Sequence, residues 1–361
     1  MKRIRVLVVD DSVVVRRILR DVLAEDSAFE VAGVAANGKI ALSMVEQVSP
    51  DVVTLDVEMP DMDGIEVLRH LRVSSPSLPV VMFSTLTQRG AEATLDALAL
   101  GARDYVTKPA NIGSVSVGMQ RIREELLPKL KAICGGKAAV VPSASSFTPR
   151  PTSVSTMADR TGPLDIVVIG CSTGGPNALS EILPQFPADF PVPVAVVQHM
   201  PPTFTKFLAE RLNASCALQV LEAGVDEKLQ PGTIWIAPGD YHVSVYSQGT
   251  AMRLRRHQAP PENSCRPAVD VLFRTAAMTY GGRALAVILT GMGQDGLRGA
   301  QELKSVNATV IAQDEASSVV WGMPGFVVQA GLADRVVPLG QMAQEIMRRV
   351  VASHKSFAVH G

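Results

Sequence analysis

The sequence predicts an α/β protein with two domains, each built on a mainly parallel sheet. Short apolar runs alternate with amphipathic segments of helix length in residues 1–133, and this alternation returns after residue 163. That pattern is typical of a parallel sheet with helices on both faces. The length of 361 residues exceeds a usual single domain. A hydrophobic content of 47% with 4% aromatic residues fits an α/β protein rich in Val, Ile, Leu and Ala.

The first half of the chain contains five expected strands with helices between them. We expect strands where the apolar runs are short, and helices where apolar residues recur at helical spacing. The expected strands are 4–9, 29–35, 51–56, 79–84 and 104–107, and the expected helices are 14–26, 39–48, 64–72 and 91–100.

The second half begins after a segment of different composition. Residues 134–163 are dominated by Gly, Pro, Ser and Thr without periodicity, which indicates a flexible linker. Beyond it we expect strands at 164–170, 192–198, 284–290 and 309–314, helices at 176–186 and 342–354, and a hairpin-rich middle at 233–254. The predicted division is a first domain at 1–127, a helix end and flexible linker at 128–163, a second domain at 164–350 and a tail at 351–361.

Charge and cysteine usage exclude several classes of protein. A net charge of -1, from 34 basic and 35 acidic residues, argues against a nucleic-acid partner. No apolar run reaches transmembrane length, and the start of the chain is an expected strand rather than a signal peptide, so we expect no membrane insertion. The four dispersed cysteines lack metal-type spacing and indicate reduced thiols in a cytoplasmic protein.

Polar residues end successive strands of the first half, and the carboxyl ends of parallel strands share one sheet edge. Any one of the acidic residues alone would more often be a helix N-cap. Together they favour a site for a hard divalent cation and a phosphoryl group. We expect Asp56 to be the phosphorylated nucleophile, Asp10 and Asp11 to hold Mg²⁺, Lys108 to pair with the phosphate, and Ser84 to hydrogen-bond a phosphate oxygen.

Residues 1–127 resemble a response-regulator receiver domain. The matching pieces are the DD pair, D-x-x-M-P at 56–60, MDG at 62–64 and TKP at 107–109, and Tyr105 matches the switch aromatic of that family. The resemblance implies a flavodoxin-like fold of strand order 2-1-3-4-5 and phosphorylation by a histidine kinase of the CheA type. It also implies Mg²⁺ ligands from Asp10, Asp11, Asp56 and the backbone of Glu58.

A serine in a Gly-rich turn marks the second half. In LDIVVIGCSTGGPNALSEIL an expected strand leads into an expected helix, and Ser172 lies in the turn. Such a turn can bind a phosphate, as in dinucleotide-binding proteins. That interpretation is weak because GCSTGG is not G-x-G-x-x-G, and no acidic residue that could bind a ribose follows about 20 residues on. The alternative is the G-x-S-x-G of residues 170–174, a sharp elbow that exposes a nucleophile beside backbone oxyanion donors.

A serine nucleophile needs a base and an orienting carboxylate. Among the six histidines, His199 ends an expected strand and shares the sheet edge with Ser172, while His242 is the second candidate.

Three aspartates compete as the orienting carboxylate. Asp295 follows the strand 284–290 in a Gly-rich loop and is the first choice, ahead of Asp270 and Asp314. We expect Asp270 to be a helix N-cap or an ion-pair residue.

Residues 164–350 resemble the catalytic domain of the CheB family of chemotaxis protein-glutamate methylesterases. The matching segments are GCSTGGP, QHMP, IAPGDYH, VDVLFRTAA, LTGMGQDG and GMPG. Carried over to this chain, the family's triad falls on Ser172, His199 and Asp295, with the backbone at Met292 and Thr173 in the oxyanion site. The order Ser…His…Asp differs from the Ser…Asp/Glu…His of α/β-hydrolases.

Two positions depart from the family pattern. Cys171 stands where Ala is usual, and we expect it to pack as a small hydrophobe. The alternative, a nucleophile that competes with Ser172, is disfavoured because Cys171 has no base of its own. Asp240 stands where Gly is usual, which puts the shape of its loop in doubt but not the triad.

The resemblance implies a phosphorylation-activated serine hydrolase that demethylates glutamyl γ-methyl esters, and deamidates glutamines, on the cytoplasmic helices of chemoreceptors. The esterase chemistry would need no cofactor. We expect the unphosphorylated receiver to lie over the esterase cleft. Two other functions stay open: a non-enzymatic adaptation scaffold in which Ser172 is an N-cap, and a hydrolase of a small-molecule ester.

Overall fold

The computed structural model describes residues 2–108, 115–135 and 163–360. The chain divides into two compact units, Met1–Gly136 and Lys137–Gly361. Most of the predicted linker lies outside the described residues. None of the described helices combines the length and the apolarity that crossing a membrane requires.

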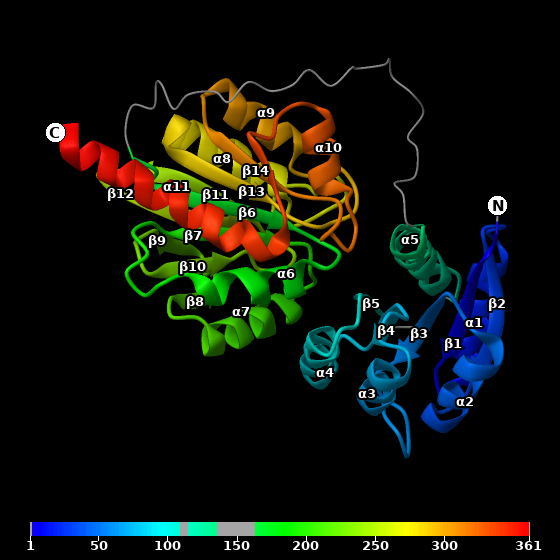
Figure 1. Cartoon of the computed structure of the whole chain (residues 1–361). Helices are drawn as coiled ribbons and strands as arrows, with labels where there is room; N and C mark the ends of the chain where they lie inside the picture. Colours follow the sequence, from blue (N-terminus) through cyan, green and yellow to red (C-terminus); the bar gives the residue numbers. More distant parts are fainter. Residues whose placement is uncertain (1, 109–114, 136–162, 361) are drawn as a thin grey trace. The chain divides into compact units, whose positions relative to one another are not determined.

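The first unit is a five-stranded parallel sheet of order β2-β1-β3-β4-β5, which confirms the predicted order (Figure 1). Helices α1 and α5 cover one face, and α2, α3 and α4 cover the other. The elements are β1 Ile4–Val9, α1 Val13–Ala24, β2 Phe29–Ala35, α2 Gly38–Val48, β3 Val52–Asp56, α3 Gly64–Ser74, β4 Val80–Ser84, α4 Gln88–Ala99, β5 Asp104–Thr107 and α5 Val115–Cys134.

Side-chain caps start the first four helices of this unit. Each cap oxygen accepts a backbone N–H of the first turn, which has no partner inside the helix. Asp63 and Glu66 add a reciprocal capping box at α3. The caps are Ser12, Asn37, Asp63 and Thr87.

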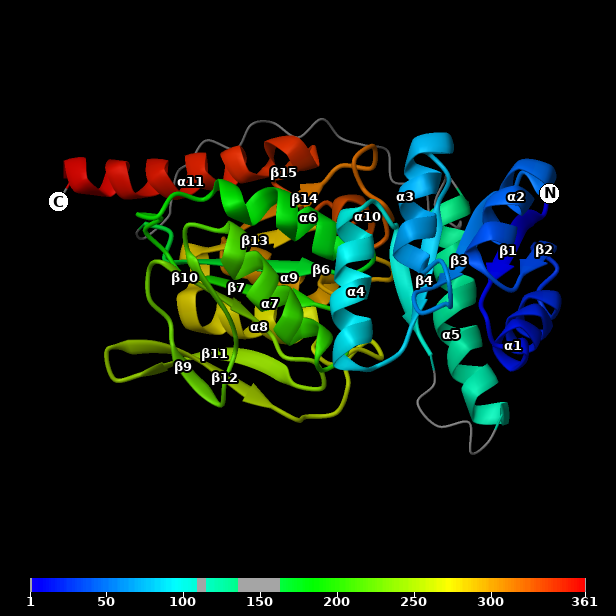
Figure 2. The same ribbon diagram turned by 90° about the horizontal axis from the view of Figure 1, so that it is seen from below.

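The second unit is a seven-stranded parallel sheet of order β15-β14-β13-β6-β7-β10-β8. Figures 1 and 2 show α6, α7 and α11 on one face and α8, α9 and α10 on the other. A separate antiparallel sheet of order β11-β12-β9 packs against α8. The predicted α/β class is confirmed for both units.

Strands and helices alternate along most of the second unit, but strands β8 to β12 follow one another without a helix between them. The elements are β6 Ile166–Cys171, α6 Gly175–Ile182, β7 Val194–Gln198, α7 Phe204–Ser215, β8 Gln219–Glu222, β9 Asp226–Lys228, β10 Thr233–Ile236, β11 His242–Gln248, β12 Ala251–His257, α8 Val269–Tyr280, β13 Ala284–Ile288, α9 Leu297–Ser305, β14 Thr309–Gln313, α10 Met323–Gln329, β15 Arg335–Val337 and α11 Leu339–His360. Short 3₁₀ turns follow α6 and α8.

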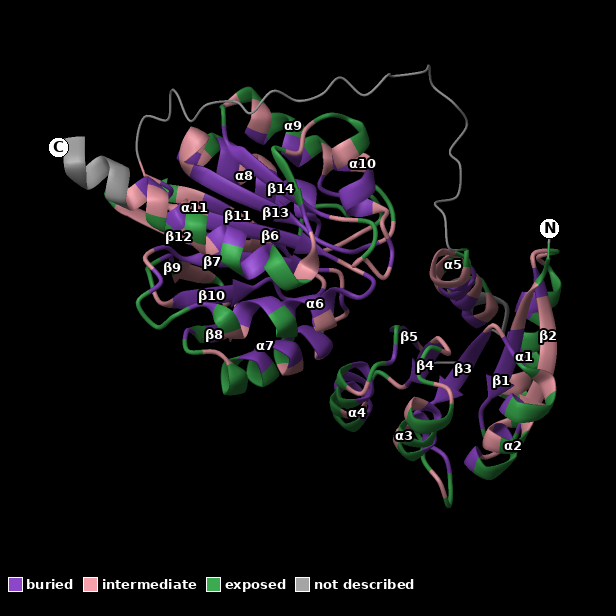
Figure 3. Cartoon of the chain, in the orientation of Figure 1, coloured by how far each residue is buried: buried purple, intermediate pink, exposed green. Residues whose placement is uncertain are grey.

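The expected hairpin-rich middle is correct for β11 and β12 and wrong for β10. Strand β10 is fully buried and lies in the main sheet, parallel to β7 and β8. The apolar run TIWI is compatible with a hairpin strand and with a buried parallel strand. Periodicity alone therefore did not show whether β10 belongs to the antiparallel sheet or to the main sheet. Figure 3 shows the central strands of both units as the buried core.

Candidate active site

A tight elbow presents Ser172 at the carboxyl end of β6. The Ser172 N–H donates to the Thr290 carbonyl (3.0 Å), and the Ser172 carbonyl accepts from the Gly175 N–H (2.7 Å). Gly174 is the N-cap of α6 and has φ 78°, a conformation that glycine adopts without strain. The backbone therefore reverses within three residues and leaves the serine at the sheet edge.

Strand order brings the other two predicted triad residues to the same edge. β6 lies between β7, which ends just before His199, and β13, which leads into the loop of Asp295. The His199 N–H donates to the Cys171 carbonyl (3.2 Å), and the Leu289 N–H donates to the Gly170 carbonyl (2.9 Å). The chain leaves β6 on one side and returns on the other, and such a topological switch point is where open α/β sheets bind ligands.

His199 and Asp295 form a hydrogen-bonded pair. His199 Nε2 lies 2.8 Å from Asp295 Oδ2. The carboxylate also accepts from two backbone N–H groups at the start of α8, Val269 at 2.6 Å and Asp270 at 3.1 Å. Burial would raise the pKa of Asp295, but the His199 hydrogen bond and charge and these N–H groups hold that pKa below its usual value. Asp295 is thus an anion held at a helix N-terminus.

The imidazole of His199 is held as a strong base. Burial disfavours its charged form, but hydrogen bonds and charge from Asp295 and Cys265 outweigh burial and raise the pKa of His199 to about 10. Nε2 faces Asp295, so Nδ1 is the nitrogen left for a proton transfer. Among the described residues, Nδ1 contacts the Cys265 sulfur at 3.6 Å and makes no hydrogen bond to Ser172.

A glycine allows the loop after β13 to approach the serine directly. A Cβ placed on Gly291 would lie 2.9 Å from Ser172 Cβ and 2.3 Å from Met323 Sδ. The Gly291 carbonyl accepts from the N–H groups of Gly322 and Met323, which fixes the loop. Within the described part of the chain, the N–H groups of Thr173 and Met292 make no hydrogen bond.

The first unit gathers its predicted residues at one edge of its sheet. Lys108 Nζ lies 2.7 Å from Asp56 Oδ2 and 3.0 Å from Asp10 Oδ2. Asp10 and Asp56 are fully buried, whereas Asp11 is exposed. Burial, with the charge of Asp10, raises the pKa of Asp56 to about 7, against the opposing effect of Lys108.

Three carboxylates of this edge fit a divalent cation. Oxygen atoms of Asp10, Asp11 and Asp56 lie within 4.8 Å of one another. Among the described residues, the Lys108 ammonium is the one donor near the buried Oδ2 atoms of Asp10 and Asp56. Clustered carboxylate oxygens with so few donors are the ligands that Mg²⁺ prefers.

Comparison with known proteins matches both units. The family model of the response regulator receiver domain matches residues 6–116, and that of the CheB methylesterase matches residues 167–346. A protein-glutamate methylesterase/protein-glutamine glutaminase of Trichodesmium erythraeum is 52% identical over 97% of this chain and 100% of its own. One of Nocardioides sp. is 51% identical over 100% of this chain and 99% of its own. The chain belongs to the CheB methylesterase family. The resemblance predicted from the sequence is confirmed.

A solved structure supports the same assignment for the second unit. The catalytic domain of the Thermotoga maritima CheB methylesterase has a TM-score of 0.51 and 44% identity, over 52% of this chain and 99% of that domain. The chain therefore joins a response-regulator receiver, a domain class with a Mg²⁺-dependent phosphorylation site, to a CheB methylesterase domain.

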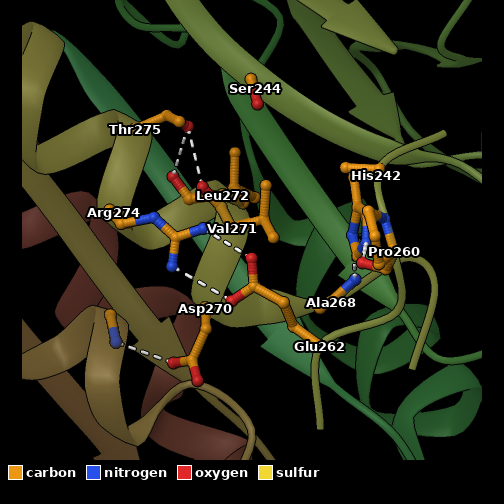
Figure 4. Close-up of polar contacts among 12 residues, drawn as sticks. His242, Ser244, Pro260, Glu262, Ala268, Asp270, Val271, Leu272, Arg274 and Thr275 are labelled. Atoms are coloured by element: carbon orange, nitrogen blue, oxygen red, sulfur yellow. Dashed lines mark hydrogen bonds and ion pairs between the residues drawn. The ribbon is translucent and has the colours of Figure 1, made fainter. Parts of the chain in front are cut away.

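In the CheB methylesterase domain, the second candidate base is unavailable. His242 is fully buried, its Nδ1 accepts from the Ala268 N–H (3.2 Å), and its Nε2 donates to the Pro260 carbonyl (3.0 Å) (Figure 4). These two backbone groups fix one neutral tautomer, so His242 has a structural role.

The two competing carboxylates also have structural roles. Ala268, not Asp270, is the N-cap of α8. Asp270 instead accepts from the N–H groups of Gly296 (3.0 Å) and Gly299 (2.7 Å) and so caps α9, a partner that sequence spacing could not reveal. Asp314 accepts from the N–H and the hydroxyl of Ser317.

Both departures from the CheB pattern have a physical account. Cys171 is fully buried, and burial raises the pKa of its thiol far above the usual value, as expected of a small packing residue. Asp240 has φ 64°, a left-handed conformation that favours glycine. Its carboxylate accepts from Arg266 Nη2 (2.5 Å) and Nε (3.0 Å), which ties two loops together.

Sequence reasoning missed the residues that support the triad. The buried Gln198 donates to the Ser172 carbonyl (3.0 Å), and Thr290 donates its hydroxyl to the Thr173 carbonyl (2.9 Å). Asn263 Nδ2 donates to both Asp295 (2.8 Å) and Asp270 (2.9 Å). Gln198 lies in QHMP and Thr290 in LTGMGQDG, so these two motifs could have indicated both residues. Asn263 lies in a loop that contains no such motif.

In the receiver, Ser84 and Tyr105 both point inward. The Ser84 hydroxyl donates to the Gly90 carbonyl (3.0 Å) and would have to rotate to reach a phosphate. Tyr105 is buried, and the Lys129 ammonium lies 5.1 Å from its ring centroid. The backbone N–H of Glu58 donates to Asp56 (3.2 Å), and the role of Glu58 as a metal ligand stays a prediction.

Proposed function

We propose that this chain hydrolyses glutamyl γ-methyl esters, and glutamine amides, on chemoreceptors through Ser172, His199 and Asp295. The Ser172 oxygen attacks the carbonyl carbon while its proton passes to His199. The tetrahedral intermediate collapses, and His199 returns the proton to methanol or ammonia as it leaves. Water then releases the glutamate by the same steps.

The hydrogen bond of Asp295 decides which imidazole nitrogen does this work. Because Nε2 is bound to Asp295, we assign the proton transfer to Nδ1. Asp295 would fix the ring and stabilise the imidazolium that forms. No group of the described residues occupies the N–H groups of Thr173 and Met292, so they could bind the oxyanion, a contribution worth about 2.7–4 kcal/mol for one donor.

The observation that carries the proposal is the His199–Asp295 pair at the sheet edge that holds the Ser172 elbow. A scaffold with an N-cap serine would need no hydrogen-bonded histidine–aspartate pair there. Ser172 is also not the N-cap of α6. That position is Gly174, and no side chain caps the helix there.

Methanol release from a methylated receptor fragment tests the proposal. Ser172→Ala should abolish release while leaving the thermal unfolding of the second unit unchanged. Release that persists in Ser172→Ala would disprove the nucleophile assignment. Activity on a small ester without any on the receptor fragment would favour the small-molecule hydrolase instead.

We propose that a CheA-type histidine kinase supplies the phosphoryl group to Asp56. Asp10, Asp11, Asp56 and the Glu58 backbone would hold the Mg²⁺ that neutralises the incoming phosphoryl charge. Lys108 would pair with the phosphate, and Ser84 would leave the Gly90 carbonyl to bind it, which changes the start of α4. The domain limits and the cytoplasmic location predicted above stay predictions.

The coupling between the sites would be inhibition by the receiver, relieved by phosphorylation. A small phosphodonor with Mg²⁺ should raise methanol release by the wild type and leave Asp56→Asn at its basal rate. A phosphodonor response in Asp56→Asn would overturn the assignment of Asp56.

A further inference from the structure

A thiol contacts the proposed base of the esterase. Cys265 Sγ lies 3.6 Å from His199 Nδ1, the nitrogen that the mechanism above assigns to proton transfer. The hydrolysis of an ester uses His199 and Asp295 but has no step for Cys265. Both side chains are partly accessible, since Cys265 is half-buried and the His199 side chain is 12% exposed.

The loop that carries Cys265 is anchored at both ends. Arg274 donates two hydrogen bonds to the Glu262 carboxylate, at 2.7 and 3.1 Å (Figure 4). Arg266 pairs with Asp240 at the other end. Between them, the backbones of Glu262 and Cys265 exchange two hydrogen bonds, at 2.8 and 3.1 Å. The sulfur is therefore held in place by a built loop.

The spacing of sulfur and nitrogen matches a tetrahedral metal site. Zn²⁺ binds thiolate at about 2.3 Å and imidazole at about 2.0–2.1 Å, so two such ligands lie about 3.6 Å apart. The observed separation is 3.6 Å. A metal-bound histidine usually donates its other ring N–H to a carboxylate, and Asp295 accepts that bond at 2.8 Å. Cys265, His199 and Asp295 lie within 4.8 Å of one another by their ligand atoms.

We propose that Cys265 Sγ and His199 Nδ1 form an inhibitory site for a thiophilic divalent cation, with Zn²⁺ as the fitting ion. Cys265 loses its thiol proton to solvent as the sulfur–metal bond forms, and water completes the coordination. The metal occupies the lone pair that must accept the Ser172 proton, so the esterase stops while the metal stays bound. The inhibitory consequence rests on the proposed function, whereas metal binding itself does not.

The experiment titrates the full-length chain with Zn²⁺ in saturating Mg²⁺, which keeps the receiver carboxylates occupied by a hard cation. Methanol release is one readout. The second is the thiolate-to-metal absorption of Co²⁺ used in place of Zn²⁺, which needs no catalysis. Each variant is compared with its own metal-free rate.

Cys265→Ser removes the soft ligand with little change of size, and Cys216→Ser removes another partly buried thiol of the same unit. We expect inhibition of the wild type that EDTA reverses, and a half-inhibiting Zn²⁺ concentration at least tenfold higher in Cys265→Ser. Cys216→Ser should respond as the wild type does. Only Cys265→Ser should lose the Co²⁺–thiolate absorption.

Equal inhibition of Cys265→Ser and wild type would overturn the site, as would a Co²⁺ spectrum without thiolate absorption in the wild type. Ser172→Ala separates the two proposals. If it keeps the Co²⁺–thiolate absorption, the metal site stands independently of the nucleophile. If the wild type shows that absorption but releases no methanol, the proposed function fails and the metal site remains.

Discussion

At the scale of single residues, Asp295 connects the proposed base of the second unit to the surrounding backbone. It is buried, anionic and bonded to His199, to the start of α8 and to Asn263. Replacing such a carboxylate by an amide keeps its shape but favours the wrong imidazole tautomer, which costs serine hydrolases about 10⁴ in kcat.

We therefore expect Asp295→Asn to lower methanol release by about 10⁴. Without the Asp295 charge, the pKa of His199 falls from its raised value of about 10. The residual kcat/KM should accordingly reach its plateau at a lower pH than in the wild type. A pH–rate profile with an unshifted midpoint would contradict the role of Asp295 in setting that pKa.

Asp240 allows a test of backbone strain against an ion pair. Asp240→Gly loses the Arg266 contact but relaxes the left-handed backbone, whereas Asp240→Ala loses the contact and keeps the strain. A non-glycine residue in this conformation costs about 1–2 kcal/mol. We expect Asp240→Gly to be the more stable of the two by about 1 kcal/mol in urea unfolding of the second unit. An equal loss in both variants would show that the Arg266 pair dominates.

At the scale of elements, the loop from β13 to α9 is shaped around Ser172. Gly291→Ala would force its Cβ against Ser172 Cβ and Met323 Sδ, at distances that real Cβ atoms do not show. We expect methanol release to fall at least about tenfold, because the proposed Met292 donor moves from the oxyanion position. Gly340→Ala is the matched control, since its Cβ would meet nothing closer than 3.6 Å. Equal activity of the two variants would show that this loop tolerates displacement.

The sequence revealed those elements whose residues are buried on both sides. Every residue of strands β6, β7, β13 and β14 is buried, and their sequences are accordingly almost entirely apolar. The short strand β9 has no buried residue and β15 has one, so neither contains such a run and periodicity did not find them. For the site, strand ends located the triad candidates and already ranked His199 above His242. The backbone contacts that hold His242 in place, from Ala268 and Pro260, could not be read from the sequence.

At the scale of the whole molecule, the two units can be followed separately during unfolding. Both tryptophans, Trp235 and Trp321, lie in the second unit. Tryptophan fluorescence therefore reports the methylesterase domain, and a calorimetric transition without a fluorescence change reports the receiver. This separation is required because a single unfolding free energy is not defined for two domains.

The receiver should lose stability as the pH rises, until Mg²⁺ is added. Burial raises the pKa of Asp56 to about 7 in the folded receiver, against 3.8 for an aspartate carboxyl in the unfolded chain. Between these values the folded state holds a proton that the unfolded chain has released, so the free energy of unfolding falls as the pH rises from about 4 to about 7.

Asp56→Asn removes this titrating carboxyl and should flatten the pH dependence of the receiver transition. Above pH 7, Mg²⁺ should raise the wild-type transition temperature more than that of Asp56→Asn, because the cation replaces the missing proton. Parallel pH profiles for the two proteins without Mg²⁺ would show that Asp56 is already ionised beside Lys108, and that the ion pair outweighs burial.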